Sequence, residues 1–349
     1  MPLQYRYMKK KLIQIFKYLL FFGLGVFLIW LSIHQIKSNP KEWLEFKQAL
    51  STANYWLFIP VFGILSASHV LRALRWRILM QPMGYNTSFS NTFFAVMIGY
   101  MANMAVPRLG EVLKCTILAK YEKVPAEKII GTIVAERAFD VVSLGTIFLL
   151  ALIVQFDVVM AAYQHLQEFM AINPKQAENE NKKWILLAVA LIVVTLFIWF
   201  WISKKLTTFI KAIQKIIKGV WEGLNTARKL KQKKLFFIYS VGIWGLYLVG
   251  TWIGFYATQG TAGLGINTAI SCLAFASIGM IVTPGGIGAY AYLLAIVLQL
   301  QTPSIPTSIG YANGTLQWFA QCIIVLFVGF ICLILLPWYN KKREKDLAV

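Results

Sequence analysis

Long apolar runs alternate with short polar stretches along the chain of 349 residues. An α-helix needs roughly 20 apolar residues to cross the hydrocarbon core of a bilayer. Six runs reach that length: 12–33, 55–79, 130–156, 184–203, 236–258 and 309–337. The pattern predicts an all-α integral membrane protein with a single polytopic membrane domain, residues 1–349.

Two further apolar stretches are each broken near the middle by proline and glycine. Residues 89–120 are interrupted at "PRLGE", and residues 266–300 at "TPGGIGAY". Pieces of about 15–18 residues are short for a full span and suit re-entrant hairpins. Two broken segments that enter from opposite sides indicate a central binding site in transporters. A possible inverted repeat is therefore a hypothesis, and the sequence leaves open whether the hairpins cross fully.

Positive charge gathers in alternate loops. The net charge is +20, and most basic residues lie in the N-terminal stretch, at 72–77, at 120–128, in 204–234 and in the final "KKREK". Cytoplasmic loops are enriched in Lys and Arg, which predicts cytoplasmic N- and C-termini. No basic module interleaved with aromatic residues appears, so we expect no nucleic-acid partner.

The segment 204–234 has apolar residues at helical spacing, with Lys211, Lys215 and Lys218 on the other face. This predicts a cytoplasmic amphipathic basic segment. It could lie on the inner leaflet, attracted by anionic lipid, or it could be a connector with a solvated basic face. Amphipathicity alone does not separate the two readings.

No catalytic, metal or cofactor motif stands out. The four cysteines, Cys115, Cys272, Cys322 and Cys332, lie in apolar surroundings without a CxxC pair, which is typical of small core residues. The "TPGGIGAY" stretch lacks the Lys-Ser/Thr of a nucleotide-binding loop. We therefore expect no metal, no cofactor and no enzymatic activity.

The first candidate site follows the break at "PRLGE". Burying one charged residue at mid-membrane costs roughly 2.5–3.5 kcal/mol, so such residues pair or line a cavity. Arg108, Glu111 and Lys114 are three apart and fall near one face of a helix. Pro107 would be the first residue of that helix, and Gly110 would let a ligand approach the backbone. The helix N-terminus beside Arg108 suits a phosphate.

The second candidate site is "AERAFD", inside an otherwise apolar span. Glu136 and Asp140 are four apart and share a face, and Arg137 is expected to pair with Asp140 at i, i+3. With the first group, these residues balance three cations against three acids, which makes mutual burial tolerable. The six could hold a lipid headgroup or merely lock the helices together; we favour the first, since intramembrane ionisable residues are functional candidates by default.

Two more motifs are candidates. The tip of the second hairpin is rich in residues that turn the chain: Pro284, Gly285, Gly286 and Gly288. Its backbone N–H groups could bind an anion, or the tip could be a plain tight turn. Arg72 and Arg75 lie near the end of the second span, where a stop-transfer cluster is the favoured reading; phosphate contact, by Arg75 in particular, is the alternative.

At these residues the chain resembles the lysylphosphatidylglycerol synthase transmembrane-region family of flippase-like membrane proteins. The matching stretches are "RALRW" (72–76), "PRLGEVLK" (107–114), "AERAFDVV" (135–142) and "TPGGIGAY" (283–290), in the family's order. In that family a glutamate often follows the Pro-Gly-Gly motif, where this sequence has Ala291. The soluble aminoacyl-transferase domain of the synthases does not appear, so we do not expect this chain to make the aminoacylated lipid by itself.

The resemblance implies that the chain moves a phospholipid, aminoacylated or not, or a lipid-linked glycan between leaflets of the cytoplasmic (inner) membrane of a prokaryote. Arg108, Arg137 and the hairpin tips would hold the phosphate, and the acids would balance them or hold an amine. Two alternatives stay open: a membrane enzyme that uses Glu111 or Asp140 as acid or base, and a scaffold or regulator of envelope synthesis.

Overall fold

The computed structural model describes residues 22–106, 108–156 and 230–348, and its regular elements are all helical. Four helices are long and apolar enough to cross a membrane: Tyr55–Met83, Ala126–Val154, Lys233–Ala257 and Thr307–Asp346. They correspond to four of the six predicted spans. Part of a fifth is the apolar helix Phe22–Ser38. The predicted span 184–203, residues 12–21 and nearly all of 204–234 lie outside the described residues.

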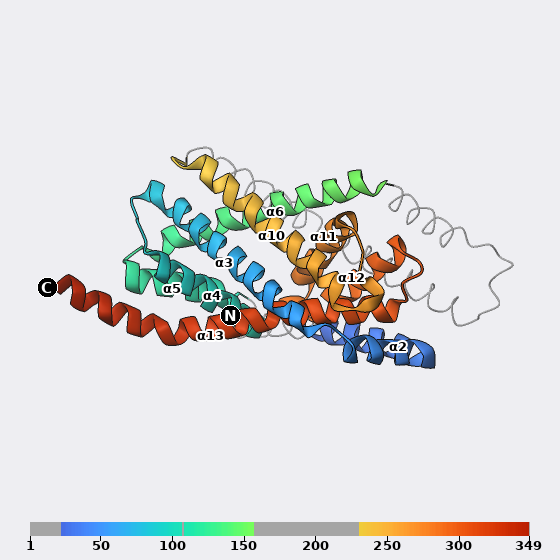
Figure 1. The fold of residues 1–349 in the computed structure, drawn as a ribbon. Coiled ribbons are helices and arrows are strands. Elements are labelled where there is room, and N and C mark those ends of the chain that lie inside the picture. The colour runs from blue at the N-terminus through green and yellow to red at the C-terminus, as the bar shows by residue number, and fades with distance from the viewer. Residues whose placement is uncertain (1–21, 107, 157–229, 349) are drawn as a thin grey trace, which may run out of the picture.

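After α2 (Pro40–Ser51), the described helices form two groups of four. The first is α3 (Phe58–Met80), α4 (Phe89–Ala105), α5 (Leu109–Glu122) and α6 (Ala126–Val154); the second is α10 (Lys233–Gly254), α11 (Ile266–Val282), α12 (Ala289–Gln301) and α13 (Thr307–Ala348). In Figure 1, α3 runs toward the end of the molecule where α13 finishes, and α10 runs away from it. The same element order in opposite directions agrees with a possible inverted repeat.

The pairs α4–α5 and α11–α12 form hairpins at the two predicted breaks. At 1.5 Å per residue their arms are about 20–26 Å long, less than the roughly 30 Å of a bilayer core. The prediction that Pro107 starts the second arm was wrong, because α5 begins at Leu109 with Arg108 as its N-cap residue. Pro107 itself lies outside the described residues.

Each hairpin needs a glycine where its arms cross. A Cβ on Gly110 would fall on the carbonyl oxygen of Gly99, and a Cβ on Gly279 would lie 2.7 Å from the backbone nitrogen of Tyr290. The prediction that Gly110 admits a ligand is therefore corrected: it admits the neighbouring helix, α4. Backbones can approach this closely only where a side chain is absent.

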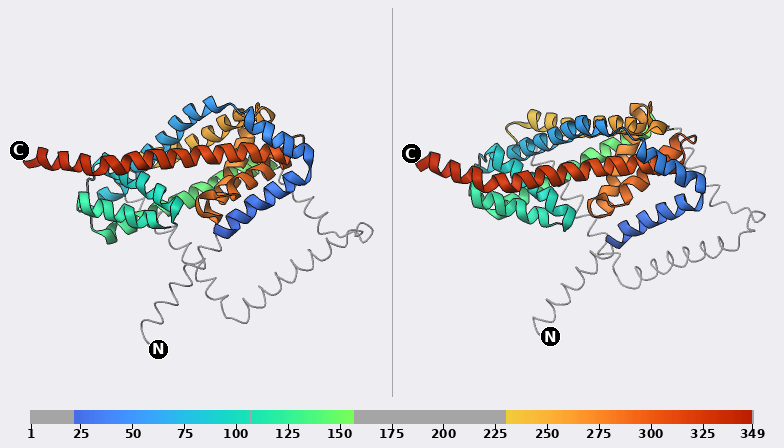
Figure 2. Two further views of the ribbon diagram at one scale, coloured as in Figure 1. Left: turned by 90° about the horizontal axis from the view of Figure 1, so that it is seen from below. Right: turned by 60° about the horizontal axis from the view of Figure 1, so that its bottom comes forward.

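The two hairpin tips meet near the middle of the molecule. The turn η6 (Pro284–Gly286) of the second hairpin contacts α4, and Gly285 lies next to Met104. Figures 1 and 2 show the hairpins reaching this point from opposite ends, with α13 alongside both. The fold thus brings two breaks in helical structure together, far apart in sequence, at the centre of the helix bundle.

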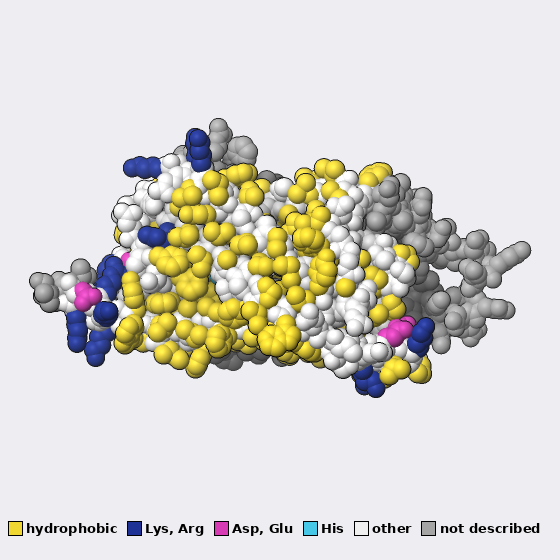
Figure 3. Space-filling model, viewed as in Figure 1, with side chains coloured by type: hydrophobic (Ala, Val, Ile, Leu, Met, Phe, Trp, Pro, Cys, Tyr) yellow, Lys and Arg dark blue, Asp and Glu magenta, His cyan; other side chains and the backbone are white. Residues whose placement is uncertain are grey.

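The distribution of hydrophobic and basic side chains over the surface is typical of a membrane protein. On the face seen in Figure 3, hydrophobic side chains cover the middle, while Lys and Arg lie toward the ends. At the end where α13 finishes, Glu122 accepts hydrogen bonds from Ser88, Asn91 and Arg343. Burial opposes its ionisation, but these bonds hold the pKa of the Glu122 carboxyl below its ordinary value. This end of α13 is thereby tied to the first hairpin.

Candidate functional site

A network of five charged side chains lies between α3, α5 and α6. Asp140 accepts a hydrogen bond of 2.7 Å from Nη1 of Arg72 and one of 2.6 Å from Nη2 of Arg75. Oε1 of Glu136 lies 3.4 and 3.6 Å from the same two guanidinium nitrogens, and its Oε2 lies 3.8 Å from Nζ of Lys114. The predicted shared face of Glu136 and Asp140 is confirmed, because both face the two arginines of α3.

The network is buried and carries excess positive charge. Arg75 is fully buried, and Lys114 and Glu136 are each 1% exposed. Three cations face two carboxylates, which leaves one positive charge uncompensated within the network. Removing one partner from such a cluster typically costs about 3–5 kcal/mol, since the other charge stays buried. The network therefore locks the three helices together and carries one net positive charge.

Aromatic side chains shield the cations. Nζ of Lys114 lies 4.9 Å from the ring centroid of Tyr100 and 5.2 Å from that of Trp76. Arg72 lies over the same Tyr100 ring and donates a hydrogen bond of 3.1 Å to the hydroxyl of Tyr247 on α10. Cation–π contacts of this kind gain strength where water is excluded. They hold the cations without neutralising them.

Arg137 forms a separate pair, contrary to the prediction that it binds Asp140. Its Nη2 lies 3.1 Å from Oε1 of Glu111, and both side chains are partly exposed. Arg72 and Arg75 already occupy both oxygens of Asp140, so the spacing along α6 does not decide the partner. Asn103 at the end of α4 donates to Glu111 and accepts from the Gly110 N–H, which ties this pair to the first hairpin tip.

Arg108 does not join the network. It is exposed at the hairpin tip and has the left-handed backbone conformation, with φ of 70°. A residue with a Cβ adopts this conformation at a cost of about 1–2 kcal/mol. Of the three charges predicted to fall near one face of α5, Lys114 reaches the network and Glu111 pairs with Arg137, while Arg108 stays outside.

The tip of the second hairpin is unwound, as predicted. Gly285, Gly286 and Gly288 have positive φ angles of 62°, 76° and 71°. The N–H groups of Gly286 and Ile287 donate within the turn itself, to Thr283 and Pro284. These hydrogen bonds favour the tight-turn reading of the motif over the anion-binding one. The carbonyl of Gly285 instead accepts a hydrogen bond of 2.7 Å from the indole of Trp318.

A cavity of about 610 Å³ lies where the two hairpins meet. Among the predicted site residues, Arg137, Asp140 and Gly285 line it, while Arg75, Lys114 and Glu136 lie behind Asp140 and Arg72. Sequence reasoning did not single out His69, Tyr100 or Tyr247, which also line the cavity. It named Arg72 with Arg75 as a stop-transfer cluster and kept phosphate contact as the alternative.

The cysteines agree with their predicted role, since Cys115, Cys272, Cys322 and Cys332 are all buried and free. Over residues 22–106, 108–156 and 230–348, no three His, Cys, Asp or Glu side chains are grouped to hold a metal ion.

Comparisons with known proteins relate the chain to a family of membrane proteins. A family model described as the lysylphosphatidylglycerol synthase transmembrane region matches residues 14–329. A UPF0104 membrane protein of Methanocaldococcus jannaschii is 23% identical over 297 residues, which cover 79% of this chain and 82% of the relative. No solved structure matches the chain.

Proposed function

The chain belongs to the lysylphosphatidylglycerol synthase transmembrane-region family, and from that membership we propose that it moves a phospholipid or lipid-linked substrate between membrane leaflets. In this proposal α4–α5 and α11–α12 are re-entrant hairpins that enter from opposite sides. The protein lies in the cytoplasmic membrane of a prokaryote, with both termini in the cytoplasm. The substrate's phosphate binds beside Arg72 and Arg137.

One observation carries this proposal: the central cavity has a net positive lining at one end. Arg72 and Arg137 line that end with Asp140, and Asp140 is already bound by two arginines. In the described part of the chain, the buried Nε of Arg72 has no hydrogen-bond acceptor. A buried donor without a partner is costly, so a small displacement of Arg72 that brought Nε to a phosphate oxygen in the cavity would be favourable.

Transport also fits the state of the acids better than catalysis does. A general acid or base must exchange a proton with substrate and needs a reachable, adjustable carboxyl group. Asp140 is held by two guanidinium groups, Glu136 is buried behind it, and Glu111 is paired with Arg137. Each acid is therefore bound to a cation, and we propose that this chain is not an enzyme.

The proposed orientation rests on the charges at the two ends. Lys120 and Lys123 lie at the end of α5, beside Glu122, which Arg343 binds at the C-terminal end of α13, where the other basic residues of 341–345 also lie. Lys41 at the other end is paired with Glu45. The positive-inside rule assigns the more basic end to the cytoplasm.

The proposal is tested by following lipid translocation in proteoliposomes with a fluorescent phosphatidylglycerol and a membrane-impermeant quencher. We expect Arg72→Gln to lose at least about nine-tenths of the rate, because the phosphate loses its main partner. Arg72→Lys keeps the charge without the planar fork and should fall in between. The control Lys341→Gln, on an exposed lysine, should keep the wild-type rate. Wild-type translocation by folded Arg72→Gln protein would contradict the proposal.

A further inference from the structure

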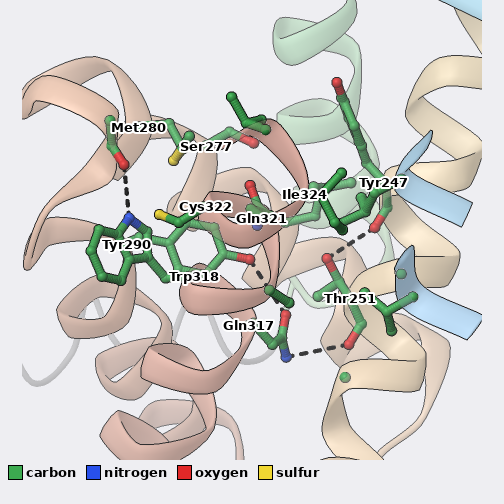
Figure 4. Close-up of a pocket in the computed structure, with 18 of the residues that line it drawn as sticks. Tyr247, Thr251, Ser277, Met280, Tyr290, Gln317, Trp318, Gln321, Cys322 and Ile324 are labelled. Atoms are coloured by element: carbon green, nitrogen blue, oxygen red, sulfur yellow. Dashed lines mark hydrogen bonds between the residues drawn. The ribbon is translucent and has the colours of Figure 1, made fainter. Parts of the chain in front are cut away.

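The central cavity has a second end with different chemistry. Away from Arg72 and Arg137, its lining is largely apolar and includes neutral polar and aromatic side chains from the second group of helices: Thr251, Ser277, Tyr290, Gln317, Trp318 and Gln321. Figure 4 shows these residues around the cavity, contributed by α10, α11, α12 and α13. This neutral end is not needed to hold a phosphate.

Hydrogen bonds fix the side chains of the neutral end. The hydroxyl of Tyr290 donates to Oε1 of Gln317 at 3.4 Å, and Nε2 of Gln317 donates to Asn313 at 2.8 Å. The Trp318 ring is held by its bond to the Gly285 carbonyl. Fixed amide and hydroxyl groups on one side and an aromatic ring on the other form a surface for a hydroxyl-bearing ligand.

Packing alone does not explain these residues. Uncharged polar groups at membrane depth are costly unless they are hydrogen-bonded, and apolar side chains would fill the space at less cost. Gln321 is only partly buried and borders the cavity. A helix as apolar as α13 thus carries two glutamines one turn apart, Gln317 and Gln321, at the cavity it helps to form.

In the described part of the chain, the cavity offers no unpaired carboxylate to an ammonium group. Among its described lining residues, Asp140 is the one acid, and Arg72 and Arg75 occupy both of its oxygens. An ammonium group inside would therefore have no counter-charge and would face two guanidinium groups. Like charges placed together in a buried site cost several kcal/mol.

We propose that the substrate headgroup is a phosphodiester that carries an uncharged polyol, glycerol or a sugar, and no ammonium group. The phosphate binds at Arg72 and Arg137, and the hydroxyls bind at Tyr290, Gln317 and Gln321. This inference rests on the proposed transport function and narrows its substrate class. It also separates the chain's substrate from aminoacylated phospholipids.

The test compares two lipids of equal charge, phosphatidylglycerol and phosphatidylethanol, which differ in the two hydroxyls of the headgroup. Their binding to the purified full chain in detergent is measured by native mass spectrometry. We expect phosphatidylglycerol to bind about tenfold more tightly, the effect of one to two hydrogen bonds. Phosphatidylinositol in place of phosphatidylglycerol shows whether a ring polyol or glycerol is the better ligand, and either result supports the proposal.

Two variants test whether residues of the neutral end distinguish the two lipids. Gln321→Leu and Tyr290→Phe should bring the ratio of the two affinities close to one, whereas the control Gln48→Leu on the exposed face of α2 should keep it near ten. Two variants are used so that a folding defect in one, visible in its thermal unfolding, does not leave the question open.

Equal binding of the two lipids by the wild type would overturn the inference, as would tighter binding of lysyl-phosphatidylglycerol than of phosphatidylglycerol. If translocation depends on Arg72 but the lipids bind equally, the inference fails and the proposed function stands. If the lipids are discriminated but none is translocated, the proposed function fails and the binding site stands.

Discussion

The hairpin α4–α5 brings charged side chains to the centre of the molecule, whereas the hairpin α11–α12 brings none. The first has Arg108 at its tip and Glu111 and Lys114 on its second arm; residues 266–301 of the second contain no Lys, Arg, His, Asp or Glu. Both cross their arms at a glycine and both leave the helical conformation at the tip. Two hairpins with similar backbone structure thus give the shared cavity one charged end and one neutral end.

Removing a charge from the first half should have the largest effect. We expect Asp140→Asn to lower the free energy of unfolding by about 3–5 kcal/mol, because Arg72 and Arg75 stay buried without their shared carboxylate. Glu111→Gln, in a partly exposed pair, should cost less than about 1 kcal/mol. Denaturant unfolding in detergent measures both. Equal losses in the two variants would show that the network is no more interdependent than a surface pair.

The crossing glycines should respond alike in the two hairpins. Gly110→Ala and Gly279→Ala each place a Cβ against backbone, and overpacking of this kind costs about 1–3 kcal/mol or more. Gly145→Ala on α6, with open space at the Cβ position, is the control and should leave stability nearly unchanged. Thermal unfolding of the three proteins measures these losses of stability. If only one of the two hairpin glycines lowered stability, the two hairpins would not be equivalent.

The tips should respond in opposite directions, with the smallest effect. Arg108→Gly removes the Cβ from a residue in the strained left-handed conformation and should stabilise the protein by up to about 1 kcal/mol. Gly285→Ala imposes the same conformation on a Cβ, at φ of 62°, and should destabilise by a similar amount. The denaturant concentration at the midpoint of unfolding measures both effects on stability. Destabilisation by Arg108→Gly would mean that the Arg108 side chain makes a contact worth more than the strain.

Much of the fold could be predicted because it is encoded locally. The apolar runs at 55–79, 130–156, 236–258 and 309–337 became helices within a few residues of the predicted limits, apart from an extension of α13 at its C-terminal end. Proline and glycine disrupt a helix wherever they occur in its interior, so both breaks could be placed. The faces of α6 also followed from helical spacing.

The partners across helices could not be predicted. Arg72 binds Asp140, 68 residues later, and Tyr247, 175 residues later. A single sequence carries no signal for such pairs, so Arg72 was read as a stop-transfer residue and Arg137 was assigned to Asp140, three residues along the same helix. The cavity has the same origin: its neutral end joins residues of four helices that only the packed bundle brings together.

Helix α13 contacts both hairpins along one stiff rod. Gly310 and Gly314 lie against Ala295 and Ala291 of α12, and 15 residues later Gly329 lies against Met101 of α4. That interval is about 22 Å of continuous helix, and reciprocal amide bonds of Asn340 with Asn91 follow beyond it. Within this interval α13 contains no proline, and Pro337 follows it. A helix without a kink resists sharp bending, so α13 acts as a rigid spacer that fixes the distance between the points where the two hairpins attach.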